Sequence, residues 1–519
     1  MSTQSPDRGI IYNWDGAPHG YSAYPQSIEQ FLDKVYAPIA DTQVGTLCWC
    51  IALHEATWPS EQLDMVGDST QRRYDSVRTL HHVENIRAFF ERGEDPYGAL
   101  VARGRELGIA VMPSVRMNDN HFWDLRPTDL ATTSRHELTA LRKTHPEWVL
   151  GTEQAPAWCS TSWNIAIPEV RAHILNLVAE ACRQADWDGI ELDWQRHAFH
   201  LPEDHAHRLR YTLTDLMRAI RTTTDEIAAQ RGRPFALAVR IATTFESCRR
   251  IGYDVEDWVR SGLCDLVIAG GNSGSDPGAE VERFVDLCHP HGVQFYGGFD
   301  SDGRQQAQRL RPHRQWRTEW FRGLAQNYLD RGADGIYVFN WHGHRDTHRS
   351  LLETMGSVQT LRGLDKVYTA LHRSIGPKSG PRADAERDDR IYGEVPVDLF
   401  PTLTATGPIF HISINDDLSP TEVELQIEIA HFTAEDKLRV LLDGQDLDAP
   451  LVRDIKAEDP NDPSDITENK WLSWSLGLGQ VERGVREIQL ILIERDPRLR
   501  IPLRIEHVEI YLRYSHSNS

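Results

Sequence analysis

Short apolar runs alternate with longer segments of helical period along most of the chain. Eight runs rich in β-branched and aromatic residues fit buried strands, and they lie at 9–15, 44–52, 109–117, 188–194, 235–243, 264–271, 293–300 and 334–341. The segment 168–185 between two of them is helical in pattern, because Pro168 suits a first turn and Val170, Ile174 and Val178 recur on one face. Eight strand–helix repeats predict an α/β fold, a closed (β/α)₈ barrel over residues 1–375.

The pattern changes towards the C-terminus. Residues 376–397 are rich in Gly, Pro and charged residues, which is typical of a linker. Residues 398–519 show apolar residues at every second position, between turn residues, and this predicts an antiparallel β-sandwich. Such an accessory domain could bind carbohydrate, pack against the barrel or form a homo-oligomer, and the pattern does not separate these roles.

Composition and charge limit the kinds of partner that this 519-residue chain is expected to bind. Its 77 acidic and 56 basic residues give a formal charge of −21, which disfavours a nucleic acid partner. No run of about 18 apolar residues occurs, and the N-terminus has neither a basic segment nor an apolar signal core. We therefore expect a soluble, cytoplasmic protein without a membrane partner. The seven scattered cysteines indicate reduced thiols in the core.

Side-chain alternation selects the strongest candidates for chemistry. Glu191 and Asp193 share one face of the fourth predicted strand, and the C-terminal ends of barrel strands form the active site in this fold. Two carboxylates facing the interior of a barrel are costly to desolvate without a polar cavity. The alternative is a structural ion pair with a barrel arginine, Arg116 or Arg240.

Hydrolysis of a glycosidic bond needs two carboxyl groups, one as acid and one as nucleophile or base. Asp193 is the candidate for nucleophile or base. For the acid, the sequence offers Asp300 at the end of the seventh strand, Glu246 just after the fifth, and Glu191. Spacing alone does not choose among these three.

Further polar and aromatic residues fall where strands end or loops begin. The candidates for substrate binding are Asp15, Arg116, Asn118, Arg196, Arg240, Asn272, Asn340, Trp341 and His342. The three arginines among them would suit an anionic sugar. Two long loops at 53–83 and 118–167 are expected to roof the cleft with Trp58, Trp123, Trp148, Trp158 and Trp163.

From the sequence we expect neither a metal site nor a cofactor site. Among its 23 histidines are His121, His197, His200 and the W-H-G-H segment at 341–344, but no H-E-x-x-H motif accompanies them. The glycine-rich segment 270–274 lacks the lysine and the spacing of a phosphate-binding loop.

Three segments carry a resemblance to a known family. They are KTHPEWVLG at 143–151, the stretch 163–196 with N-x-x-x-P-E-V-R and D-G-I-E-L-D, and GADGIYVFNW at 332–341. In this order and spacing the chain resembles the family-10 glycosyl-hydrolase-like proteins, which are (β/α)₈ barrels allied to the α-amylase and α-galactosidase groupings. The resemblance covers the barrel only, and it implies a sugar-active protein with Asp193 at the nucleophile position of the allied families.

The fourth predicted strand is also similar to the chitinase signature D-G-x-D-x-D-x-E. This chain reads D-G-I-E-L-D-W-Q at 188–195, so Gln195 stands where that signature has its acid. The sequence thus predicts a glycosidase that acts on an oligosaccharide or polysaccharide fragment. Two alternatives stay open: a carbohydrate-binding pseudoenzyme, and a metal-dependent hydrolase of sugar esters or amides.

Overall fold

The computed structural model describes most of the chain. The described residues are 7–14, 23–52, 55–122, 124–133, 135, 138–155, 159–270, 275–300, 317–341, 343–371, 393–416, 419–454 and 469–514. Within these ranges, no helix combines the length and the apolar character that a membrane span requires.

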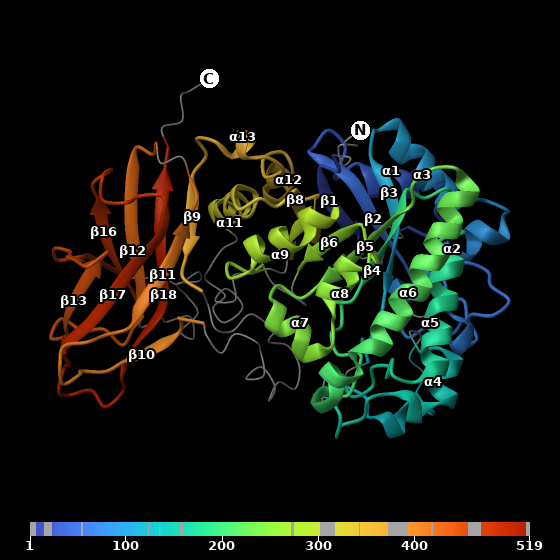
Figure 1. Cartoon of the computed structure of the whole chain (residues 1–519), viewed down its shortest axis with the longest axis horizontal. Coiled ribbons are helices and arrows are strands. Elements are labelled where there is room, and N and C mark those ends of the chain that lie inside the picture. Colours follow the sequence, from blue (N-terminus) through green and yellow to red (C-terminus); the bar gives the residue numbers. More distant parts are fainter. Residues whose placement is uncertain are drawn as a thin grey trace.

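The N-terminal part is a closed barrel of eight parallel strands in the order β1 to β8 (Figure 1). The strands are β1 (Ile10–Trp14), β2 (Val44–Ala52), β3 (Ala110–Arg116), β4 (Gly189–Asp193), β5 (Ala236–Ile241), β6 (Leu266–Ala269), β7 (Gln294–Asp300) and β8 (Gly335–Phe339). The barrel closes where β1 pairs with β8. All eight predicted strands are thus confirmed, with ends shifted by a few residues.

Helices surround this barrel. They are α1 (Ile28–Tyr36), α2 (Val77–Glu91), α3 (Pro96–Glu106), α4 (Ala140–Thr144), α5 (Pro168–Ala181), α6 (Ala206–Arg231), α7 (Phe245–Ile251), α8 (Val255–Arg260), α9 (Val281–Cys288), α11 (Thr318–Asp330), α12 (Asp346–Leu352) and α13 (Val358–Leu361). Local chemistry fixes several ends. Ser27 and Gln30 form a capping box at α1, and Pro168 begins α5 as predicted.

Alternate residues of the barrel strands pack into two different apolar cores. Ile190 and Leu192 of β4 belong to the large core between the strands and the helices. A separate cluster fills the barrel interior with Ile11, Cys48, Met112, Ala238, Leu266, Ile268, Tyr296, Tyr337 and Phe339. All seven cysteines are buried free thiols. This division confirms that residues of one parity on β4 and β5 point into the barrel.

The C-terminal part consists of two antiparallel sheets, drawn in orange and red in Figure 1. One sheet has the order β10 (Val397–Leu399), β18 (Leu503–Arg513), β12 (Glu422–Ala430), β16 (Lys470–Leu476), β15 (Leu451–Asp454), and the other β11 (Ile409–Ile414), β17 (Gly484–Glu494), β13 (Lys437–Leu442), β14 (Gln445–Asp446). Their inner faces share one apolar core. The predicted sandwich-like architecture is therefore confirmed.

The sandwich begins earlier than the sequence pattern suggests. Strand β9 (Lys366–Thr369) lies before the predicted boundary at residue 375, yet it pairs antiparallel with β18. The predicted linker 376–397 falls largely outside the described residues. Strand β9 contributes Tyr368 to the sandwich core, and so a strand that follows the last barrel helices directly completes the accessory sheet.

Helix α11 carries the contact between barrel and sandwich (Figure 1). Asn327 of α11 donates to the carbonyl oxygen of Ser413 at 3.0 Å and accepts from the backbone N–H of Asn415 at 3.1 Å. Arg317 pairs with the buried carboxylate of Glu509 at 2.6 Å. Packing against the barrel is thus one role that the sandwich does fill, whereas sugar binding and homo-oligomer formation stay predictions.

Candidate functional site

Charged side chains gather at the C-terminal ends of four barrel strands. Arg116 is the last residue of β3, Asp193 of β4 and Asp300 of β7, and Arg240 is the penultimate residue of β5. In the strand register Asp193 pairs with Arg116 on one side and with Arg240 on the other. These four residues are at most 2% exposed. The charged layer lies where barrel enzymes place their active sites.

Asp193 is held by four hydrogen bonds. Nη1 of Arg240 donates to both carboxylate oxygens at 2.9 Å, and the backbone N–H groups of Gln195 and Arg196 each donate to Oδ1 at 2.9 Å. The guanidinium of Arg240 lies 4.0 Å from the centre of the Phe339 ring. Burial opposes the charge of Arg240, but Asp193, with smaller contributions from Tyr337 and Glu191, keeps the pKa of Arg240 above its usual value. The arrangement fixes Asp193 in one orientation.

Glu191 lies one layer deeper and is fully buried. Tyr337 donates its hydroxyl to Oε1 and Asn13 its amide N–H to Oε2, both at 2.6 Å. Burial, and next the nearby charge of Asp193, raise the pKa of Glu191 to about 7, against the smaller opposing effects of Tyr337, Ser114 and Arg240. Glu191 therefore holds its proton to a higher pH than an ordinary glutamate does.

The raised pKa of Glu191 predicts a pH-dependent stability. In the unfolded chain the group titrates near 4.5 and in the folded chain near 7, so its protonated form stabilises the fold below about 4.5 and that contribution is lost as the pH rises through 7. Relative to Glu191→Gln, the wild type should lose on the order of 3 kcal/mol of unfolding free energy over this window. Urea denaturation of both proteins at several pH values measures the difference. A difference that stays constant between pH 4 and 8 would contradict the assignment.

The other two candidate acids differ in position. Asp300 is 2% exposed at the end of β7, and its backbone N–H donates to Ser275 Oγ at 3.2 Å. Its charge also contributes to the raised pKa of Arg240. Glu246 is exposed in the first turn of α7. Asp300 thus lies within the electrostatic reach of Arg240, together with Asp193 and Glu191, whereas Glu246 faces solvent.

Several residues predicted to bind substrate instead make contacts that hold the fold together. The Asn118 amide donates to the Trp163 carbonyl oxygen at 3.1 Å and accepts from the Trp163 N–H at 3.0 Å, so it joins two parts of the long third loop. Trp341 is 3% exposed, packs edge-on against Phe321 and donates to the His348 carbonyl oxygen at 3.0 Å. Its ring belongs to the core. Asn340 is half-buried with a positive φ of 51°, an uncommon conformation that recurs at functional sites.

The remaining predictions concern the loops. Asp15, Asn272, His342, Trp123 and Trp158 lie outside the described residues. Trp58 and Trp163 are fully buried, and Trp148 is half-buried with its ring stacked on His145 at 3.8 Å. Of the three described loop tryptophans, then, Trp148 alone is not fully buried.

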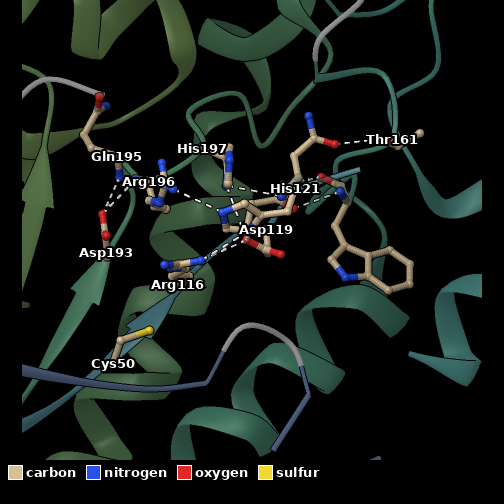
Figure 2. Close-up of polar contacts among 12 residues, drawn as sticks. Cys50, Arg116, Asp119, His121, Thr161, Asp193, Gln195, Arg196 and His197 are labelled. Carbon is tan, nitrogen blue, oxygen red and sulfur yellow. Dashed lines mark hydrogen bonds and ion pairs between the residues drawn. The ribbon is translucent and has the colours of Figure 1, made fainter. Parts of the chain in front are cut away.

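The structure also assembles a cluster that the sequence analysis missed. Asp119, His121 and His197 each offer a ligand atom within 4.8 Å of the others. The fully buried Asp119 Oδ1 lies 2.7 Å from His121 Nδ1, 3.5 Å from His197 Nδ1 and 3.2 Å from Arg116 Nη1. Figure 2 shows Arg196 reaching into this cluster beside Asp193. We name these five side chains, Arg116, Asp119, His121, Arg196 and His197, the rim cluster.

The hydrogen bonds of the rim cluster determine what it can bind. Arg196 Nη2 lies 3.1 Å from His121 Nε2, and His121 Nδ1 lies 2.7 Å from Asp119 Oδ1 and 3.4 Å from Arg116 Nη1, so both ring nitrogens of His121 have polar partners. The His197 Nδ1 accepts from the backbone N–H of Asn120 at 3.1 Å. Three of the four ring nitrogens of His121 and His197 therefore already have hydrogen-bonding partners, and two guanidinium groups lie close by. The geometry fits a cation poorly.

The cluster nonetheless has defined charges. Burial opposes the ionisation of Asp119, but His121, His197 and Arg116 together hold the pKa of Asp119 well below its usual range. Burial, and next the charge of Arg196, hold the pKa of His197 well below its usual range. Asp119 is thus a carboxylate and His197 is neutral at pH 7.

Comparisons with known proteins find likeness in structure alone. No protein-family model matches the chain. No curated protein matches its sequence either. The resemblance to the family-10 proteins therefore stays a prediction.

Several solved glycoside hydrolases are similar to the chain in structure. A family 18 N-acetylglucosaminidase from Paenibacillus barengoltzii is 12% identical with a TM-score of 0.35, and the match covers 67% of this chain and 100% of that chain. A class V chitinase from Nicotiana tobaccum is 11% identical with a TM-score of 0.36, and the match covers 68% of this chain and 99% of that chain. A variant of the family 36 α-galactosidase AgaA from Geobacillus stearothermophilus is 11% identical with a TM-score of 0.36, and the match covers 96% of this chain and 56% of that chain. At this level of similarity, function has to be inferred from the residues of this chain.

Proposed function

We propose that this protein is a glycoside hydrolase whose active site lies at the C-terminal end of the barrel, with Asp193 as nucleophile or base. The observation that carries the proposal is the pair on β4. Asp193 is held in one orientation by Arg240 and two backbone N–H groups, one layer above Glu191 with its raised pKa. A carboxylate held in a fixed orientation at the C-terminal end of a barrel strand is placed to act on a bound glycan.

Asp300 is the proposed acid. It ends β7, three strands from β4 in the closed barrel, so a substrate can lie between the two carboxyl groups. Glu191 is buried behind Asp193 and bound by Tyr337 and Asn13, which suits a residue that tunes Asp193 rather than one that reaches a leaving oxygen. Glu246 is exposed on α7, away from this layer.

In the proposed reaction the acid donates its proton to the glycosidic oxygen as the C–O bond breaks. Asp193 either attacks the anomeric carbon or removes a proton from the attacking water, and water finally supplies the hydroxyl group of the new reducing end. Oligosaccharide panels that span neutral and acidic glycans test this directly. Release of reducing ends from at least one glycan by the purified wild type is the expected result, and no release from any of them would contradict the proposal.

A carbohydrate-binding pseudoenzyme is the second candidate, because one specific observation favours it. Both oxygens of Asp193 already accept hydrogen bonds, and Gln195 occupies the position of the acid in the chitinase-like pattern. Such a protein would bind glycans with the same cleft and cleave none of them. Binding of a glycan by calorimetry without any release of reducing ends would identify this alternative.

A further inference from the structure

The turn that follows β4 supplies the backbone donors of Asp193. The N–H groups of Gln195 and Arg196 each donate to Oδ1 of Asp193 at 2.9 Å, and Figure 2 shows both hydrogen bonds. The N–H of Gln195 belongs to the same planar peptide group as the carbonyl oxygen of Trp194. A group that binds this oxygen therefore also fixes the direction of the N–H that points at Asp193.

Tyr253 and His200 lie at the Trp194 carbonyl oxygen. The hydroxyl of Tyr253 donates to this oxygen at 2.6 Å, and Nε2 of His200 lies 2.9 Å from it and 2.9 Å from the Tyr253 hydroxyl. All three residues are at most 1% exposed. A hydrogen bond to a carbonyl oxygen polarises the peptide group, so the N–H at its other end becomes a better donor. Two hydrogen bonds and one peptide group thus join Tyr253 to Asp193.

The two side chains behind the turn keep their protonation states over the ordinary pH range. Burial, and next Cys248 and the charge of Asp193, raise the pKa of the Tyr253 hydroxyl well above its usual value. Burial lowers the pKa of His200 to about 4, against the opposing hydrogen bond to Trp194. Tyr253 therefore stays a donor and His200 stays neutral between about pH 5 and pH 9.

The end of helix α7 places Tyr253 behind the turn. Gly252 ends α7 with a φ of 87°, a left-handed conformation that favours glycine, and the N–H of Tyr253 donates to the Cys248 carbonyl oxygen at 2.8 Å. A Cβ at Gly252 would lie 2.8 Å from the carbonyl oxygen of Ala206, which leaves no room for a side chain. The Tyr253 ring then packs beside Trp194, with ring centres 5.9 Å apart.

We propose that Tyr253 is a positioning residue of this site, which holds the Trp194–Gln195 peptide so that its N–H stabilises the charged carboxylate of Asp193 in one orientation. The proposal rests on the proposed function, in which Asp193 is the nucleophile or base. Tyr253 and Trp194 belong to the core between the strands and the helices, so Tyr253 acts from behind the strand and not on the substrate itself.

Replacing Tyr253 by Phe in the full chain tests the proposal. The variant loses one hydroxyl, and the Trp194 carbonyl oxygen keeps His200 beside it, so the variant is expected to fold. On the glycan that the wild type cleaves best, kcat should fall about 10-fold while KM changes by less than about 2-fold, because the substrate loses no contact.

The pH–rate profile distinguishes positioning from a general loss of structure. Its acidic limb should move to higher pH by about 0.3 to 0.7 units in Tyr253→Phe, since a weaker donor stabilises the charged carboxylate less. The charged side chains of this barrel end are the same in both proteins, among them Arg116, Glu191, Arg240 and Asp300.

Hydrogen exchange gives a second readout that needs no substrate. In the wild type the amides of Gln195 and Arg196 are bonded to Asp193. Mass spectrometry of peptides that cover residues 194–196 should show exchange at least about 5-fold faster in Tyr253→Phe, whereas peptides from β2 and α5 should exchange as in the wild type. A general loss of stability would raise exchange in all of these peptides.

Tyr36→Phe is the matched control. Tyr36 is 2% exposed, and its hydroxyl donates to the backbone carbonyl oxygen of Leu100 at 2.6 Å, which is the same hydrogen bond between α1 and α3. This variant should keep the wild-type kcat, pH–rate profile and exchange at residues 194–196.

The outcomes separate this inference from the proposed function. An unchanged rate and pH–rate profile in Tyr253→Phe, or losses equal to those in Tyr36→Phe, overturns the inference but leaves the glycosidase standing. Cleavage of no glycan by the wild type contradicts the glycosidase, and hydrogen exchange then decides whether Tyr253 positions Asp193. Faster exchange confined to residues 194–196 supports that role, and unchanged exchange there overturns it.

Discussion

Replacing Arg240 by Met is expected to lower the free energy of unfolding by about 3–5 kcal/mol. Arg240 and Asp193 are each 1% exposed and 2.9 Å apart, so the substitution leaves a buried carboxylate without its counter-ion. Methionine preserves much of the side-chain volume beside Phe339, which limits the loss of packing. Urea denaturation followed by circular dichroism measures the change.

The control for Arg240→Met is an exposed pair of the same chemistry. Arg105 and Asp186 lie 2.6 Å apart with side chains 49% and 53% exposed, and Arg105→Met should change the unfolding free energy by less than about 1 kcal/mol. The double variant Asp193→Asn/Arg240→Met should recover part of the lost stability, since no unpaired charge remains. A loss for Arg240→Met as small as that for Arg105→Met would show that the buried pair does not hold the barrel end together.

Replacing Asp193 by Asn is expected to lower turnover of the best glycan by at least about 10²-fold, while binding is retained. Asparagine keeps one oxygen, which can still accept from the backbone N–H groups of Gln195 and Arg196 and from Arg240. It lacks the negative charge that a nucleophile or a base requires. Initial rates and calorimetry on the same preparation separate the two effects.

Asp186→Asn is the control for Asp193→Asn, because it makes the same chemical change at an exposed site. It should leave both turnover and binding unchanged. Equal losses of turnover and of binding in Asp193→Asn would point to a distorted cleft instead, and the circular dichroism spectrum of the variant would reveal whether it is folded.

The fold could be predicted because its signal is periodic. Eight apolar runs separated by helical segments correspond to the eight strands of the barrel, and alternation within β4 placed Glu191 and Asp193 on the inner face. The sequence also predicted, as an alternative role for Asp193, an ion pair with a barrel arginine. The structure contains this ion pair, between Asp193 and Arg240. Strand β9 has only four residues, too few for alternation to distinguish it from a loop.

The site could be predicted only in part, because loops bring together residues that are distant in the chain. Arg196 and His121 are 75 positions apart, and no spacing rule joins an arginine after β4 to a histidine after β3. The signal available was that both follow the ends of neighbouring strands. Trp341 shows the reverse case: its place after β8 suggested the cleft, but its side chain turns into the core against Phe321.

We propose that Asp193 does chemistry on a glycan at the end of the barrel. The most direct measurement is the rate at which reducing ends are released from the glycan that the wild type cleaves best, by the wild type and by folded Asp193→Asn at equal concentration. The wild type should release reducing ends, and the variant, which still binds the glycan, should release them at a rate at least about 10²-fold lower. Equal rates for the two proteins would contradict it.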